Sequence, residues 1–155
     1  MGKILLVEDD EKIIRILKLQ LERKNHEVTV KQNGIDALNN IDKNRDYYDL
    51  MLLDLGLPLM EGDKVCKSVR KISNVPIIVV SARNSVEEKV DLLKSGASDY
   101  VTKPFEFLEL EARIEINIRK EKTSEIIYKT LKLNIDNYSV FFNKKPISFT
   151  KTEFE

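Results

Sequence analysis

Short, continuous apolar runs separated by amphipathic stretches limit the architectures open to this chain. Residues 4–7 (ILLV), 50–53 (LMLL) and 77–80 (IIVV) are apolar without interruption and have polar residues nearby. Each run predicts a strand that is buried on both faces of a sheet. Because amphipathic helical stretches separate the runs, we expect a parallel sheet with helices on both faces.

The apolar runs belong to five repeats of a strand followed by a helix. Strands are predicted over residues 3–7, 27–30, 50–54, 76–80 and 98–102. Asp10 can cap a helix that runs to about Lys24, and Ser85 begins a capping box whose helix stops near Gly96. Ligands of such sheets bind outside the carboxyl ends of the strands, near the point where the strand order reverses. Functional residues are therefore expected at those ends.

Residues 107–118 give two conflicting signals. Apolar and polar residues alternate there, which is typical of a strand, but the content of Leu, Ala, Glu and Arg favours a helix. In a helix, one side carries Phe107, Leu110, Ile114 and Ile118, and the opposite side carries Leu108, Ala112 and Ile116. We predict a helix that is apolar on two sides, one for the core and one for a second surface.

The sequence changes character after Glu121. A polar linker at 121–126 precedes strand-like pieces at 127–133, 139–142 and 147–149. Residues 150–153 (TKTE) have the spacing of a capping box, and the sequence ends two residues later. We interpret residues 1–120 as one domain and residues 127–155 as the incomplete, β-rich beginning of a second domain.

Composition argues against several classes of protein. Lys plus Arg and Asp plus Glu both number 26, so net charge does not indicate binding to nucleic acid or to a membrane. No apolar stretch approaches the roughly 18 residues that span a bilayer, and no signal peptide is recognisable. The single cysteine, Cys66, excludes an internal disulfide and is predicted to be a small buried side chain. A cytoplasmic protein is expected.

Carboxylates follow two of the predicted strands. Glu8 and Asp9 come after the first strand, and Asp54 ends the third. Like charges that a fold brings together are costly unless a cation neutralises them. Three carboxylates suit a hard divalent ion, and Mg²⁺ fits best. Asp54 could bind the metal through one oxygen and attack phosphorus with the other.

The fourth and fifth strands also end on polar residues. Ser81 follows the fourth strand, and Lys103 with Pro104 follows the fifth. A hydroxyl donor and a cation are the groups that phosphoryl transfer requires near the phosphoryl oxygens. Pro104 is a candidate for a cis peptide bond in a tight turn. The four strand ends together predict a site that receives a phosphoryl group.

Four strings of residues carry a resemblance to a known family. Residues 4–10 (ILLVEDD), 53–58 (LDLGLP), 77–83 (IIVVSAR) and 96–105 (GASDYVTKPF) resemble the receiver domain of two-component response regulators. The resemblance covers about residues 2–120 in order and spacing. It implies a flavodoxin-like (CheY-like) fold, a doubly wound parallel sheet of five strands. It also implies a phosphorylation switch rather than an enzyme, with a sensor histidine kinase as partner.

The resemblance gives each residue at the strand ends a role. Asp54 is then the phosphoacceptor, and Mg²⁺ is held by Glu8, Asp9, Asp54 and the backbone carbonyl of Gly56. The phosphoryl group is sensed by the switch hydroxyl of Ser81, by Lys103 and by the coupled aromatic residue Tyr100. The family usually carries a larger side chain at the position of Gly56.

The same resemblance predicts a homodimer on phosphorylation. In OmpR/PhoB-type regulators, receivers pair through the face made by the fourth helix, the fifth strand and the fifth helix. The apolar patch of this face comprises Val90, Leu93 and Ala112, which Ile116 could extend. Flanking ion pairs are expected for Lys89 with Glu109, Asp99 with Arg113, and Lys94 with Glu115, the last in the reverse of the family's usual order. Exposed pairs of this kind give register more than affinity.

The tail from residue 130 resembles the opening β-sheet of the winged-helix output domain in OmpR/PhoB-type regulators. Lys151 stands where that family often has proline. The recognition helix and wing would lie beyond residue 155. Specific binding to promoter DNA is therefore expected only when a complete winged-helix domain is present.

Other classes of function fit the residues less well. A Mg²⁺-dependent phosphatase with an aspartyl intermediate would, by family pattern, have a second aspartate where this chain has Gly56. A nucleotide-binding module would show a Gly-x-Gly-x-x-Gly motif or a P-loop, and neither is present. A stand-alone receiver that acts through protein contacts stays open. The only histidine, His26, follows a predicted helix; it is expected at the surface and is no candidate for a phosphorelay or a metal site.

Overall fold

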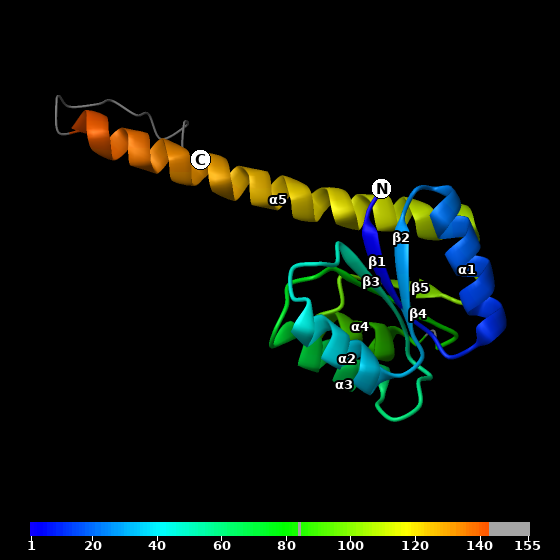
Figure 1. The fold of residues 1–155 in the computed structure, drawn as a ribbon. Coiled ribbons are helices and arrows are strands. Elements are labelled where there is room, and N and C mark those ends of the chain that lie inside the picture. Colours follow the sequence, from blue (N-terminus) through cyan, green and yellow to red (C-terminus); the bar gives the residue numbers. More distant parts are fainter. Residues whose placement is uncertain (84, 143–155) are drawn as a thin grey trace. The chain divides into compact units, whose positions relative to one another are not determined.

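The computed structural model describes residues 1–83 and 85–142, with side chains after residue 119 described only at 126, 127 and 129–131. The chain forms two compact units, Met1–Ile118 and Arg119–Glu155. The first unit contains the whole sheet and is shown with its helices in Figure 1. In the part of the chain that is described, no helix is both long enough and apolar enough to cross a membrane.

Five parallel strands form the sheet, in the order β2-β1-β3-β4-β5. Their bounds are β1 Lys3–Val7, β2 Glu27–Lys31, β3 Leu50–Asp54, β4 Ile77–Ser81 and β5 Asp99–Thr102. These bounds confirm the predicted strands to within one residue at each end, because the apolar runs are long enough to mark them. The strand order reverses between β1 and β3, so the carboxyl ends of these two strands meet at the predicted position for a ligand.

Helices cover both faces of the sheet, as Figure 1 shows. Their bounds are α1 Glu11–Arg23, α2 Gly34–Lys43, α3 Gly62–Arg70, α4 Val86–Lys94 and α5 Phe107–Phe142. The predicted caps are present, since the side chain of Asp10 accepts from the backbone of Lys12 and Ile13, and that of Ser85 accepts from Glu88. The doubly wound architecture that the sequence predicts is confirmed.

Alternate side chains of the strands pack into two separate hydrophobic cores, one on each face of the sheet. Leu5 and Val7 point to the core beneath α2, α3 and α4, whereas Ile4 and Leu6 point to the core beneath α1 and α5. Cys66 lies fully buried in the first core, as predicted, and burial raises the pKa of its thiol. The strands are thus buried on both faces, which explains their unbroken apolar runs.

The conflicting signals over residues 107–118 resolve as a helix. Leu110, Ile114 and Ile118 are buried against the sheet, and Phe107 packs partly against the same core. Leu108, Ala112 and Ile116 are exposed on the other side. The prediction of a helix with two apolar sides is therefore confirmed.

The strands expected at 127–133 and 139–142 are wrong for the described residues, whereas the linker expected at 121–126 stays a prediction. The structure continues α5 through all three segments as far as Phe142. A strand needs a neighbour to satisfy its backbone hydrogen bonds, whereas a helix that is already nucleated extends at low cost. The strand at 147–149 and the capping box at 150–153 lie outside the described residues, and the division into two domains stays a prediction.

His26 also differs from the prediction, because its side chain is buried and not at the surface. The chain turns after α1 through Asn25, whose φ is +66°. The backbone N–H of His26 then donates to the carbonyl of Leu21, at 3.2 Å. The imidazole lies against α5, where its Nε2 is 3.2 Å from Glu111 Oε1. A position just after a helix suggested exposure, but the later helix α5 covers it.

Replacing Gly96 with alanine is expected to lower the free energy of unfolding by about 2 kcal/mol. Gly96 has a φ of +115°, and an added Cβ would collide with the side chain of Arg70. Arg70 Nε donates to the Gly96 carbonyl at 2.8 Å, so the clash would also disturb this contact. Urea denaturation measures the change. Gly56→Ala is the control, since its added Cβ would meet only Asp54 Oδ2, at 3.8 Å; equal losses in both variants would contradict the expectation.

Candidate functional site

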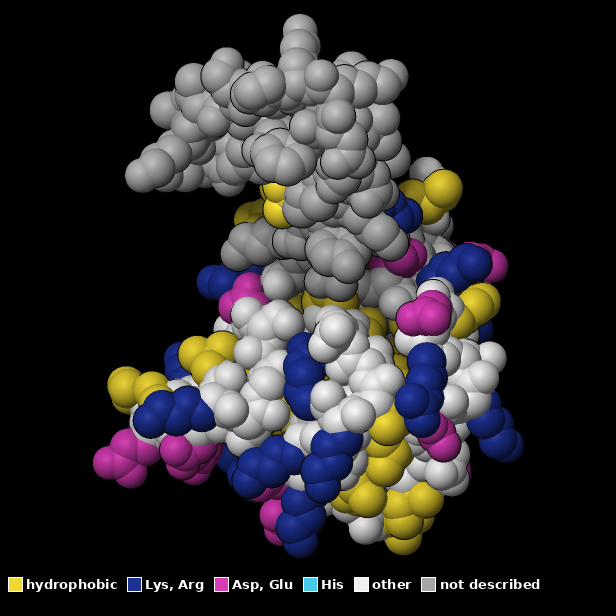
Figure 2. Space-filling view, turned by 90° about the vertical axis from the view of Figure 1, so that its left-hand side faces the viewer, with side chains coloured by type: hydrophobic (Ala, Val, Ile, Leu, Met, Phe, Trp, Pro, Cys, Tyr) yellow, Lys and Arg dark blue, Asp and Glu magenta, His cyan; other side chains and the backbone are white. Residues whose placement is uncertain are grey.

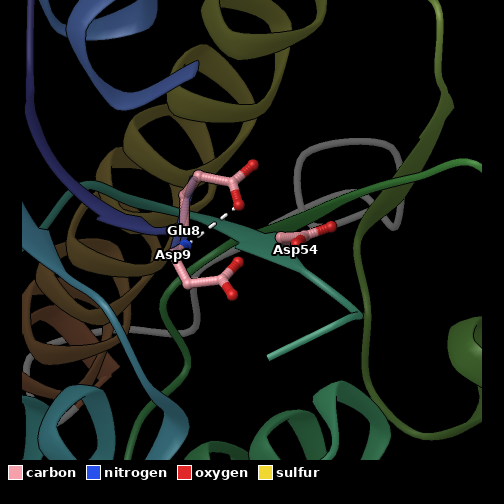
Figure 3. Close-up of side chains that lie close together, drawn as sticks. All are labelled: Glu8, Asp9 and Asp54. Atoms are coloured by element: carbon pink, nitrogen blue, oxygen red, sulfur yellow. Dashed lines mark hydrogen bonds between the residues drawn. The ribbon is translucent and has the colours of Figure 1, made fainter. Parts of the chain in front are cut away.

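The reversal of strand order brings three carboxylates together. Val7 pairs with Leu53, so Glu8 and Asp9 leave β1 beside Asp54 at the end of β3. Figure 3 shows these three side chains at the adjacent strand ends. One carboxylate oxygen from each residue lies within 4.8 Å of the other two. The sequence prediction that these acids share one site agrees with this geometry.

The three carboxylates differ in exposure. Glu8 is only 3% exposed, and its Oε2 accepts from the backbone N–H groups of Asp9 at 3.0 Å and Asp10 at 3.3 Å. Burial raises the pKa of Glu8, and the charge of Asp54 raises it further. Asp54 is half-buried and Asp9 is exposed, so solvent reaches the cluster from the side of the loops.

Lys103 supplies a cation to the two more buried acids. Its Nζ lies 3.2 Å from Glu8 Oε1 and 3.3 Å from Asp54 Oδ1. Burial alone would lower the pKa of Lys103, but the charges of Asp54 and Glu8 outweigh it and raise the pKa. The peptide bond between Lys103 and Pro104 is cis. The sequence suggested that Lys103 faces phosphoryl oxygens, and the structure adds its ion pairs with both acids.

The donor set of this cluster fits a magnesium ion. All three side chains offer carboxylate oxygens, which hard divalent cations prefer, and the grouping contains neither cysteine nor histidine. Lys103 contributes one positive charge against three carboxylates, which leaves the cluster short of positive charge. Gly56 is exposed in the loop after β3, two residues beyond Asp54. Its carbonyl as a further metal ligand stays a prediction.

Ser81 and Tyr100 both contact the backbone of Arg83, in the loop after β4. The hydroxyl of Ser81 accepts from the Arg83 N–H at 3.1 Å. The hydroxyl of Tyr100 donates to the Arg83 carbonyl. Sequence reasoning selected Ser81 and Tyr100 but missed Arg83. A residue that acts through its backbone gives no signal in its side-chain type, so only the structure could identify it.

The charged residues of the predicted dimer face make contacts within one chain. Arg113 Nη1 lies 3.0 Å from Asp99 Oδ1, and Arg113 Nε lies 3.3 Å from Glu109 Oε1. The hydrogen bond with Asp99 is the main cause of the raised pKa of Arg113. Lys89 Nζ lies 5.5 Å from the centroid of the Tyr100 ring, and among the described residues Glu109 pairs with Arg113 and not with Lys89. Around them, Val90, Leu93, Lys94, Ala112, Glu115 and Ile116 are exposed.

Comparisons with known proteins find one domain family and curated relatives of this chain. The response regulator receiver domain matches residues 4–115. Response regulator ArlR of Staphylococcus haemolyticus is 38% identical over 156 residues, which cover 100% of this chain and 70% of that protein. The uncharacterized transcriptional regulatory protein YkoG of Bacillus subtilis is 42% identical over 161 residues, covering 99% of this chain and 70% of its own length.

A solved structure extends the likeness to three dimensions. The receiver domain of the Francisella response regulator 1452 superposes with a TM-score of 0.73 at 37% identity. The superposition covers 78% of this chain and 99% of that domain.

Proposed function

The chain belongs to the response regulator family, whose receiver domain it matches over residues 4–115, and we propose that it is a switch phosphorylated on Asp54. The phosphoryl donor is a sensor histidine kinase. The single observation that supports this function best is the half-buried Asp54 between two acids and the ammonium group of Lys103. Receivers of this family are switches and not classical enzymes.

The side chains around Asp54 can each have a separate role in phosphoryl transfer. Asp54 supplies the attacking oxygen, and a carboxylate at the carboxyl edge of the sheet is open to a donor from solvent. Lys103 already contacts Asp54 and can neutralise charge on the phosphoryl oxygens. Glu8, Asp9, Asp54 and the Gly56 carbonyl would hold Mg²⁺, which would supply further neutralisation when bound. Ser81 can donate its hydroxyl to the bound phosphoryl group.

Incubation with acetyl phosphate and Mg²⁺ tests this function. We expect one acid-stable, base-labile phosphoryl group, which peptide mapping by mass spectrometry assigns to Asp54. Omission of Mg²⁺ should lower the yield strongly, because the acidic cluster then lacks the cation it needs. No modification, or modification at another residue, would overturn the proposal.

We also propose that phosphorylation promotes a homodimer through α4, β5 and α5. The exposed apolar side chains of Val90, Leu93 and Ile116 support it, and Lys89, Lys94, Glu109 and Glu115 supply complementary charges around them. The ion pairs of Arg113 with Asp99 and Glu109 would have to coexist with contacts to the second copy, or be exchanged for them.

Ala112→Glu should keep the beryllofluoride-treated chain monomeric, weakening dimerisation by about 100-fold, because it puts a charge into the apolar patch. Sedimentation equilibrium measures the dimer constant. Ile16→Glu on α1 is a matched control, since it changes another exposed apolar residue outside this face. If the treated wild-type chain itself stays monomeric at high concentration, the dimer is wrong.

Gly56→Met should slow the loss of the phosphoryl group by about tenfold, because a larger side chain would hinder water beside Asp54. Among the described residues an added Cβ meets only Asp54 Oδ2, at 3.8 Å, so the first atom of a longer side chain fits at this exposed position. The half-life of the phosphorylated chain measures the effect. Gly56→Ala, which adds only the Cβ, should change it less. An unchanged half-life in Gly56→Met would contradict this role.

The output of the switch is proposed to be transcription regulation. YkoG, which aligns with 99% of this chain, is described as a transcriptional regulatory protein. On the face shown in Figure 2, basic side chains stand among acidic and hydrophobic ones, which fits the absence of net charge. We assign promoter binding to a complete winged-helix domain; its proposed beginning at residues 127–155 would need strands where this structure has α5 as far as Phe142. The unpaired Cys66 supports a reducing, cytoplasmic setting.

A further inference from the structure

A buried polar pair joins the start of β2 to α5, on the side of the sheet away from α2, α3 and α4. His26 is 4% exposed and Glu111 is 6% exposed. The two side chains meet through a single contact, 3.2 Å between His26 Nε2 and Glu111 Oε1. His26 Nδ1 and Glu111 Oε2 are buried and have no hydrogen-bond partner among the described residues. Neither residue belongs to the phosphoryl site.

This pair is poorly satisfied where it lies. A buried carboxylate needs several donors to replace its hydration, and among the described residues Glu111 has a single partner. His26 Nδ1 and Glu111 Oε2 each give up a hydrogen bond to bulk water, and no described residue replaces it. The other buried polar side chain on the described part of α5, Asn117, instead donates to the Arg113 carbonyl at 2.8 Å within the same helix. The unfavourable free energy of burying this pair therefore weakens the packing of α5 against the rest of the first unit.

Apolar contacts oppose this cost. Leu110, Ile114 and Ile118 bury the inner side of α5 in the second core. Separation of residues 107–118 from the sheet would expose these three side chains, but it would return all the polar atoms of His26 and Glu111 to water. The net free energy that holds α5 is therefore smaller than its apolar contacts alone would provide.

We propose that the His26–Glu111 pair is a weak point: it destabilises the packing of α5 on the sheet, so that α5 opens locally before the rest of the receiver unfolds. The proposal concerns a conformational property of the free chain and does not depend on phosphorylation. Since α5 also carries Ala112 and Ile116 on its exposed side, an opening of α5 moves the face proposed for dimerisation.

The test replaces both partners by apolar residues of similar volume, His26→Leu with Glu111→Met. Because this double variant leaves no buried polar group unpaired, it should fold and raise the melting temperature by about 5 °C or more. Native-state hydrogen exchange should show the amides of 107–118 protected about tenfold more than in wild type. Amides at the centres of β1 and β3 should start from higher protection and gain by a similar factor, because global unfolding exposes the same pair. In wild type, protection of 107–118 equal to that of these strands would overturn the proposal, and so would unchanged protection of 107–118 in the double variant.

Four further variants serve as controls for this measurement. Glu111→Gln keeps a hydrogen-bonding group beside His26 but removes the buried charge, so its protection should fall between wild type and the double variant. Ile114→Val removes one buried methylene from α5 without touching the pair, and should lower the protection of 107–118. If Ile114→Val changes α5 and the double variant does not, the pair is not the weak point. The single variants His26→Leu and Glu111→Met each leave a buried partner unpaired and should be less stable than the double variant.

Discussion

Asp54→Asn is expected to abolish phosphorylation of the chain by acetyl phosphate, because the amide cannot attack phosphorus as the carboxylate does. The fold should be retained, since asparagine has nearly the same size and shape. The substitution also removes the charge that raises the pKa of Glu8, so this pKa should fall. Mass spectrometry measures the first effect, and carboxyl NMR shifts during a pH titration measure the second.

Asp49→Asn is the matched control for this experiment. Asp49 precedes β3, at the opposite end of the strand from Asp54, and its Oδ2 accepts from the backbone N–H of Lys3. Phosphorylation of Asp49→Asn should equal that of wild type. A phosphoryl group that persists in Asp54→Asn, on any residue, would show that another side chain is the acceptor.

Lys103→Gln is expected to slow phosphorylation by about 100-fold, because the variant lacks a preorganised positive charge next to the reacting oxygen. The same change should raise the affinity for Mg²⁺ by about tenfold. The sign follows from the free protein, in which Lys103 Nζ contacts Glu8 at 3.2 Å and Asp54 at 3.3 Å. Removal of this cation leaves both carboxylates to the divalent ion and takes away a repelling charge.

The two effects of Lys103→Gln have separate readouts. Calorimetric titration with Mg²⁺ reports the affinity, and the rate of acetyl phosphate labelling at saturating Mg²⁺ reports the chemistry. Lys31→Gln is the control, since Lys31 ends β2 at the same edge of the sheet. Weaker binding of Mg²⁺ in Lys103→Gln would contradict the interpretation, because it would mean that Lys103 helps to hold the ion.

The sheet and its edge could be predicted because their signals are local. An unbroken apolar run such as 50–53 identifies a strand buried on both faces, and the polar residue that follows marks its end. Parallel strands joined by helices place all their carboxyl ends on one edge. For this reason Glu8, Asp9, Asp54, Ser81 and Lys103 could be grouped without coordinates.

The errors arose where the preceding helix or a distant contact overrides the local pattern. Residues 127–133 have a strand-like composition, but the described chain offers them no neighbouring strand and α5 continues through them. His26 follows a helix and would be exposed if the chain ended there, yet α5 covers it some 85 residues later and provides Glu111. No window of sequence around His26 contains the residues that bury it, whereas residues 127–133 continue the helix that precedes them.

The sequence alone therefore determined the five strands, the family and the identity of the acids, since each depends on a few consecutive residues. Only the tertiary structure decided which groups touch: Lys103 bridging Glu8 and Asp54, Ser81 and Tyr100 meeting at the backbone of Arg83, and His26 buried beside Glu111. The physical reason is that charge and hydrogen bonding act over a few ångströms in space, whatever the separation along the chain.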